Sequence, residues 1–149
     1  MKNFSIFHQV FFATLLISGL ALAHSGATGI VKERMDAMGE IAKSMKIIAK
    51  MVKGESSFDA EQSRLAAKTI ETHSREVLNL FPEGSIHGPS EARPEIWTDW
   101  ETFSQIAKEM ETSASTIAEN ASSLNAIKPH FIALSKTCSS CHEKFRLKK

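Results

Sequence analysis

Four stretches of the chain carry apolar side chains in alternating steps of three and four residues. This spacing places the apolar side chains on one face of an α-helix, so each stretch predicts an amphipathic helix. The stretches cover residues 31–52, about 59–80, 94–117 and 124–145, and no strand pattern interrupts them. Four such helices joined by shortish connections predict an all-α, antiparallel four-helix bundle.

Seven apolar residues form the expected buried face of the first stretch, namely Val31, Met35, Met38, Ala42, Met45, Ala49 and Val52. Ile41 and Ile48 make this apolar surface wider than one buried face needs, and Leu65 adds to it on the second helix. Surplus apolar surface of this kind often marks an interface between subunits. The sequence therefore predicts a dimer through the first two helices.

Helix boundaries are marked by residues with special backbone or capping properties. Gly54 suits the left-handed position after a helix, and Asp59 with Gln62 three residues later resembles a capping box. Pro94 is a favourable first residue for the third helix. Pro129 is awkward inside a helix, so either it kinks the start of the fourth helix or that helix begins there.

The N-terminal 23 residues have the pattern of a secretory signal rather than of a fold. Lys2 supplies a short positive region, residues 10–22 are apolar, and Ala21-Leu22-Ala23 resembles a cleavage site. The apolar run is short for a membrane span, which needs about 20 residues. We expect cleavage after Ala23 and export of one domain covering residues 24–149.

Charge and composition narrow the possible functions. Removal of Lys2 with the signal leaves as many basic side chains as the 17 acidic ones, which argues against a general nucleic-acid binder. We find no predicted catalytic triad, no Gly-rich phosphate loop and no pair of carboxylates expected to lie close together. The sequence therefore predicts a protein that is not an enzyme.

The segment Cys138-Ser139-Ser140-Cys141-His142 has the pattern C-x-x-C-H, which is the attachment motif of a c-type haem. Residues three apart share a helix face, so both sulfurs can form thioethers with the vinyl groups of one porphyrin. His142 is then placed to bind the iron as the proximal ligand. Both cysteines fall on the expected core-facing side of the fourth helix, so the haem should lie inside the bundle.

Other roles for a pair of cysteines remain as alternatives. A thiol–disulfide oxidoreductase would use Cys138 and Cys141 as its redox pair, although such a motif is expected after a strand. A zinc site needs four ligands, and the sequence has no second cysteine pair. A helical interaction module with incidental cysteines is a further possibility. A colourless protein with two titratable thiols would exclude haem attachment.

The motif near the C-terminus of an exported, all-helical chain resembles class II cytochrome c, the cytochrome c′ family, including its low-spin members. The resemblance covers essentially the whole chain after the signal. It rests on residues 31–34 with Met38, on residues 51–54, 80–84 and 92–97, and on residues 138–142 with Phe145 and Arg146.

The resemblance implies a periplasmic protein with one covalent haem c, often a homodimer, that exchanges electrons with redox partner proteins or binds NO and CO. It places Arg146 on the proximal side of the haem near His142, and Arg34 and Met38 on the distal side. Low-spin members use a Met at the position of Met38 as sixth iron ligand, whereas typical members do not. Arg34 matches the high-spin pattern, so we expect an open or weakly occupied sixth position.

Overall fold

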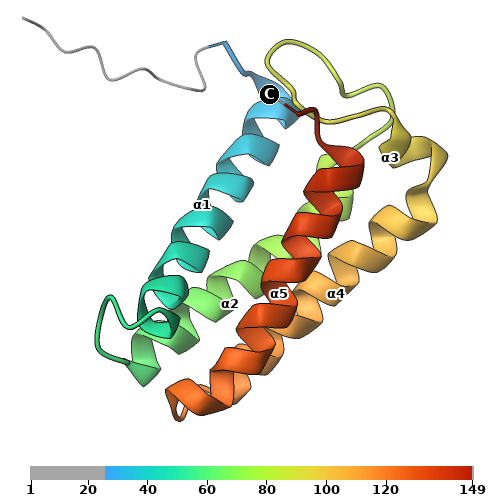
Figure 1. The fold of residues 1–149 in the computed structure, drawn as a ribbon. Helices are drawn as coiled ribbons and strands as arrows, with labels where there is room; N and C mark the ends of the chain where they lie inside the picture. Colours follow the sequence, from blue (N-terminus) through green and yellow to red (C-terminus); the bar gives the residue numbers. More distant parts are fainter. Residues whose placement is uncertain (1–25, 149) are drawn as a thin grey trace, which may run out of the picture.

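The computed structural model describes residues 26–148, which form an all-α bundle of four long helices (Figure 1). These are α1 (Gly29–Val52), α2 (Ala60–Glu76), α4 (Trp100–Glu119) and α5 (Leu124–Phe145), with the 3-10 helix η1 (Val77–Leu80) and the short α3 (Glu95–Thr98) between α2 and α4. Successive long helices run in opposite directions. This confirms the predicted fold, whereas the predicted signal, residues 1–23, lies outside the described residues.

Capping residues fix the ends of the helices at the predicted places. The Asp59 carboxylate accepts a hydrogen bond from the Gln62 backbone N–H at 2.9 Å. Gly54 has φ +75° after α1, a conformation that favours glycine, and its N–H donates to the Met51 carbonyl at 3.0 Å. α5 begins at Leu124, so the helix does not start at Pro129, which lies inside it.

The expected third helix is interrupted, which corrects the prediction of one continuous helix. The break is at Asp99, whose φ of −132° and ψ of 50° are not helical. Before it, Ile96 is buried in the core and the Trp97 indole N–H donates to the Phe81 carbonyl at 2.9 Å. A change of direction at Asp99 lets α3 make these contacts while α4 follows the axis of the bundle.

The predicted buried face of α1 is wrong. The side chains that are buried are Val31, Arg34, Ala37, Ile41, Ser44, Ile48 and Met51. Only Val31 belongs to the predicted set, while Ala42 is exposed and the methionines at 35, 38 and 45 are partly buried. Since adjacent residues differ by about 100° around a helix, the face is rotated by about one residue position.

This rotation also weakens the evidence for a dimer. Ile41 and Ile48 belong to the core, with exposed fractions of 5% and 0%, because they are on the true inner face of α1. They are therefore not surplus apolar surface. Leu65 alone of the three residues is exposed, at 58%.

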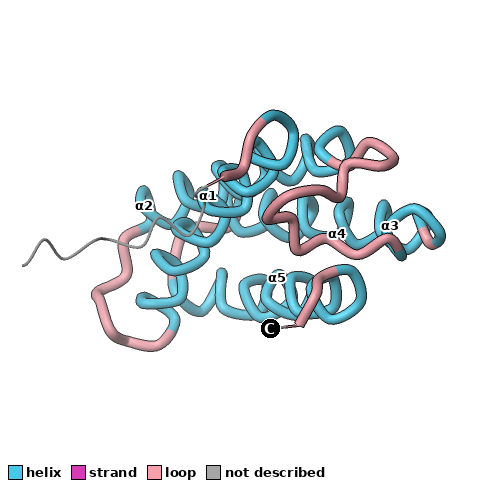
Figure 2. The backbone as a smooth tube through the Cα atoms, turned by 90° about the horizontal axis from the view of Figure 1, so that it is seen from above, coloured by secondary structure: helices cyan, strands magenta, loops and turns pink. Residues whose placement is uncertain are grey.

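The helices do not pack equally on all sides. α1 packs mainly on α2, α2 on α4 and α4 on α5, whereas the contact between α1 and α5 is the sparsest among the long-helix neighbours. Figure 2 shows α5 along one side of the bundle. None of the helices among residues 26–148 is long and apolar enough to cross a membrane.

Candidate functional site

The C-x-x-C-H motif occupies the last two turns of α5. Cys138 and Cys141 are partly buried and pack against the core, on the same side of the helix as the buried Leu134 and Phe145. Both cysteines have free thiols. His142, the next residue, is exposed. The helix therefore presents two sulfurs side by side at the edge of an apolar core, as the spacing predicts.

The surroundings of the two cysteines favour the neutral thiol. Burial raises the pKa of the Cys138 thiol. Burial, with a smaller effect of Cys138, raises the pKa of Cys141 to about 11. Both thiols therefore stay protonated at neutral pH. Since the thiolate is the nucleophile in disulfide exchange, this environment opposes the chemistry of a thiol–disulfide oxidoreductase.

The imidazole of His142 is held in its neutral form. Neighbouring protein atoms remove part of the water around the ring, which lowers the pKa of His142, and the positive charge of Arg146 lowers it further. The carboxylate of Glu91 acts in the opposite direction. A neutral imidazole is the form that ligates a metal.

Met38 lies on α1, partly buried, and packs against the same core as the two cysteines. It comes from the helix that has the sparsest contact with α5. The structure thus brings the Met38 thioether and the two cysteine thiols to the edge of one core, from two helices that hardly touch.

Arg34 is buried in the structure and makes hydrogen bonds to η1 and to the loop that follows it. Its side chain is 5% exposed, and burial lowers its pKa. The guanidinium donates to the Leu80 carbonyl at 3.0 Å, to the Ser85 hydroxyl at 2.6 Å and to the Ser90 hydroxyl at 3.1 Å. It also lies over the Phe81 ring, 4.0 Å from the centroid. Arg34 therefore fastens loop 81–94 to α1.

Arg146 fastens the same loop to the end of α5. Its Nε and Nη2 donate to Oε2 of Glu91 at 2.8 and 2.5 Å. The backbone adds two bonds, from the Arg93 N–H to the Phe145 carbonyl at 2.9 Å and from the Leu147 N–H to the Glu91 carbonyl at 2.8 Å. Sequence reasoning missed Glu91 because no local motif signals a partner that lies 55 residues away.

These residues fit a covalently bound haem. Two thiols lie three residues apart on one helix face, a histidine follows them, and both cysteines pack against the apolar core. Over residues 26–148, no group of three or more His, Cys, Asp and Glu side chains could hold a metal ion.

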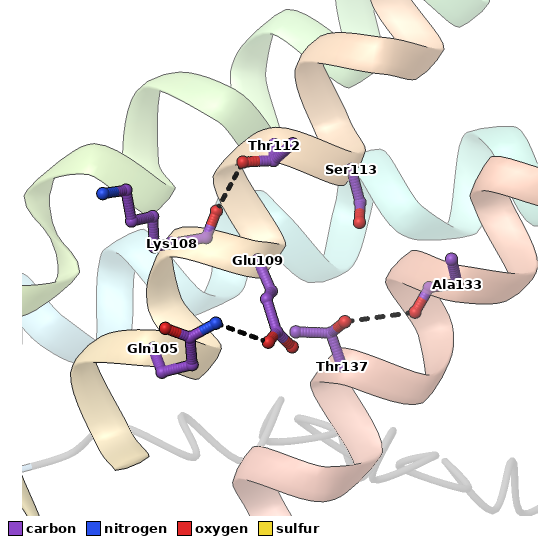
Figure 3. Close-up of a pocket in the computed structure, with 7 residues that line it drawn as sticks. All are labelled: Gln105, Lys108, Glu109, Thr112, Ser113, Ala133 and Thr137. Carbon is purple, nitrogen blue, oxygen red and sulfur yellow. Dashed lines mark hydrogen bonds between the residues drawn. The ribbon is translucent and has the colours of Figure 1, made fainter. Parts of the chain in front are cut away.

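A groove of about 390 Å³ lies between α4 and α5 (Figure 3). Its side chains bond within their own helices, for instance Gln105 to Glu109 and Thr137 to the Ala133 carbonyl. Neither cysteine, nor His142, nor Met38 lines it. Because none of the residues that the sequence singles out lines it, the groove is not the candidate site.

Comparison with known proteins gives a consistent result. The model of the family described as Cytochrome C' matches residues 29–146. Cytochrome c-556 of Agrobacterium fabrum (strain C58 / ATCC 33970) is 33% identical over 138 residues, which cover 92% of this chain and 94% of that protein.

Solved structures agree with the sequence relatives. Cytochrome c prime from Shewanella frigidimarina superposes with a TM-score of 0.76 at 29% identity, covering 80% of this chain and 94% of that one. A variant of cytochrome c prime from Alcaligenes xylosoxidans with bound NO has a TM-score of 0.73 at 27% identity, again covering 80% and 94%. The chain belongs to the cytochrome c′ family of haem proteins, and this membership implies a covalent haem c at the C-terminal C-x-x-C motif.

Proposed function

We propose that this chain is a periplasmic c-type cytochrome that carries one haem on Cys138 and Cys141 and serves electron transfer, the binding of small gases, or both. The observation that carries the proposal is the pair of half-buried thiols on one face of α5, followed directly by His142, at the edge of the core. Membership of the cytochrome c′ family supports it.

Each residue of the motif has a task in this proposal. Cys138 and Cys141 hold the porphyrin through thioether bonds, which consume both thiols. His142 provides its neutral imidazole as the proximal iron ligand. When bound, a haem supplies a one-electron iron couple and an axial position for a further ligand. The chain contributes orientation, exclusion of water by the apolar edge of the core, and the charges around His142.

Met38 is the candidate for the opposite side of the iron. A thioether is a competent ligand and raises the potential when it is paired with histidine. If Met38 does not bind the iron, its role is flexible packing at the edge of the core, which suits a partly buried methionine. We favour an open or weakly occupied sixth position, which permits gas binding beside electron transfer.

Gas binding draws support from relatives. Structures of Alcaligenes xylosoxidans cytochrome c prime variants hold NO or carbon monoxide. Members of the family are generally not enzymes, which agrees with our proposal that this chain has no catalytic activity of its own.

The oxidised absorption spectrum at neutral pH, together with carbon monoxide binding to the reduced protein, tests this proposal. We expect a high-spin spectrum and rapid carbon monoxide binding, both little changed in Met38→Ala. A sulfur-to-iron band in the far red that Met38→Ala abolishes would instead establish His142/Met38 ligation. A colourless protein with two titratable thiols would favour the thiol–disulfide alternative, which the raised pKa values of both thiols oppose.

Export and dimerisation complete the proposal. The N-terminal signal pattern and the family resemblance support a periplasmic location. For a homodimer, the remaining observation is the exposed Leu65 on α2. Sedimentation at tens of micromolar, roughly where weak interfaces associate, tests it, and a pure monomer there would count against the dimer.

A further inference from the structure

The contact between loop 81–94 and the end of α5 contains an ion pair that the proposed function does not use. Arg146 donates through two nitrogens to one oxygen of Glu91, at 2.8 and 2.5 Å. An antiparallel backbone bridge between Ala92 and Arg146 holds the two segments in register. The Glu91 side chain is 27% exposed, so this carboxylate is held more tightly than one on a free surface chain.

The pair lies directly beside His142. Arg146 follows His142 by four residues, and its backbone N–H donates to the His142 carbonyl at 3.2 Å, so the two residues are stacked one helical turn apart. The charges of Arg146 and Glu91 both act on the imidazole, and they act in opposite directions. An intact pair therefore presents little net charge to this site, whereas either partner alone presents a full one.

We propose that Glu91 is a positioning residue that neutralises Arg146 and thereby keeps the reduction potential of the α5-bound haem low. This inference rests on the proposed function, because it needs a haem ligated by His142. The oxidised iron centre carries one more positive charge than the reduced centre. A net positive charge nearby disfavours the oxidised form and raises the potential, and the charges around a metal site are a recognised means of tuning it.

The test is a potentiometric titration of the haem-loaded protein at low ionic strength, where exposed charges are least screened. Glu91→Gln keeps the size and polarity of the side chain but removes its charge, so the midpoint potential should rise. Arg146→Gln should lower it. Since removing both charges leaves the site about as neutral as the intact pair, the double variant should return close to the wild-type potential.

A matched control separates this local effect from the total charge of the protein. Glu119→Gln makes the same charge change at the last residue of α4, at the other end of the bundle from the C-terminus of α5 (Figure 1). It should leave the potential almost unchanged. Glu91→Asp restores a carboxylate and should move the potential back towards wild type, which mere disturbance of the loop would not produce.

Several results would overturn the inference. These are an unchanged or lowered potential in Glu91→Gln, equal shifts in Glu91→Gln and Glu119→Gln, and a double variant whose potential stays as far from wild type as that of Glu91→Gln. If Glu91→Gln fails to mature, Arg146→Gln tests the pair from the other side. Wild-type protein without covalent haem would be a failure of the proposed function, and is recognised before any titration.

Discussion

His142 has the most specific task that we assign to a single residue, because it alone follows the second cysteine directly. His142→Ala should leave protein with covalent haem but a strongly altered absorption spectrum, or should prevent maturation, since the proximal ligand is lost. His130→Ala, a histidine change on the same helix, is the control and should keep the wild-type spectrum. Spectra of both purified variants decide this, and an unchanged spectrum in His142→Ala would refute the assignment.

Arg34 shows how much one buried residue can stabilise. Its guanidinium bonds to acceptors at Leu80, Ser85 and Ser90, and removal of the side chain would take away all three of these bonds to a charged donor. Arg34→Ala should lower the free energy of unfolding by roughly 2–3 kcal/mol. Denaturant unfolding measures this. The exposed Arg64→Ala on α2 is the control and should change stability little, and an equal loss in both variants would contradict the account.

At the scale of residues, the sequence predicts what is local and misses what is distant. The roles that we propose for the two cysteines and His142 rest on their spacing in the sequence, which is a local signal. The contacts of Arg34 and Arg146 could not be predicted, because their partners lie 46 to 56 residues away, in η1 or in a loop without a motif. The resemblance suggested both arginines, but it did not indicate that they hold the two sides of one loop.

The start of α2 depends on one carboxylate. Asp59 accepts from the Gln62 N–H, which would otherwise lack an intrahelical partner. Asp59→Ala should lower the free energy of unfolding by about 1 kcal/mol, while Asp59→Asn should lose little because Asn is an equally good N-cap. Thermal unfolding compares the two variants. Equal destabilisation by both would show that the negative charge, and not the cap, matters.

At the scale of elements, apolar periodicity located the four helices but did not fix the rotation of α1. Its small and flexible apolar residues, alanines and methionines, formed as regular a pattern as the true inner face. That face includes the polar Arg34 and Ser44, which no hydrophobicity pattern selects. The buried face of α5 follows the apolar spacing, because Ile127, Phe131 and Leu134 are large apolar residues three or four positions apart.

Charge is distributed unevenly over the whole molecule. Residues 124–149 carry six basic side chains and one acidic one, whereas residues 95–120 carry one basic and six acidic. The segment that contains α5 is therefore the more basic of the two, although Lys144 pairs with Asp99 and Arg146 pairs with Glu91. Opposite charges steer association, and salt screens them.

Electron exchange with a small acidic redox protein should therefore slow as ionic strength rises. Lys136→Glu on α5 should slow it several-fold at low salt, and Lys108→Glu on α4 should have a much smaller effect. Stopped-flow rates over a salt series measure both. Faster exchange with a basic partner, or the same effect from the two variants, would contradict docking on the α5 side.

The bundle topology was predictable at the scale of the whole molecule because short connections make neighbouring helices antiparallel. The sparse contact between α1 and α5 could not be predicted, because it depends on how closely the two helices of each pair approach each other. The fold follows from the apolar spacing along four helices, whereas the candidate site follows from the C-x-x-C-H motif of residues 138–142.

The central claim is that α5 carries a covalent haem, and the mass of the denatured, exported protein tests it most directly. The mass should exceed that of the polypeptide, calculated from its observed N-terminus, by about 0.6 kDa, because the cofactor stays attached through two thioether bonds. The chromophore should remain with the unfolded chain, and thiol reagents should find no free cysteine. A mass equal to that of the bare polypeptide, with Cys138 and Cys141 both titratable, would contradict the account.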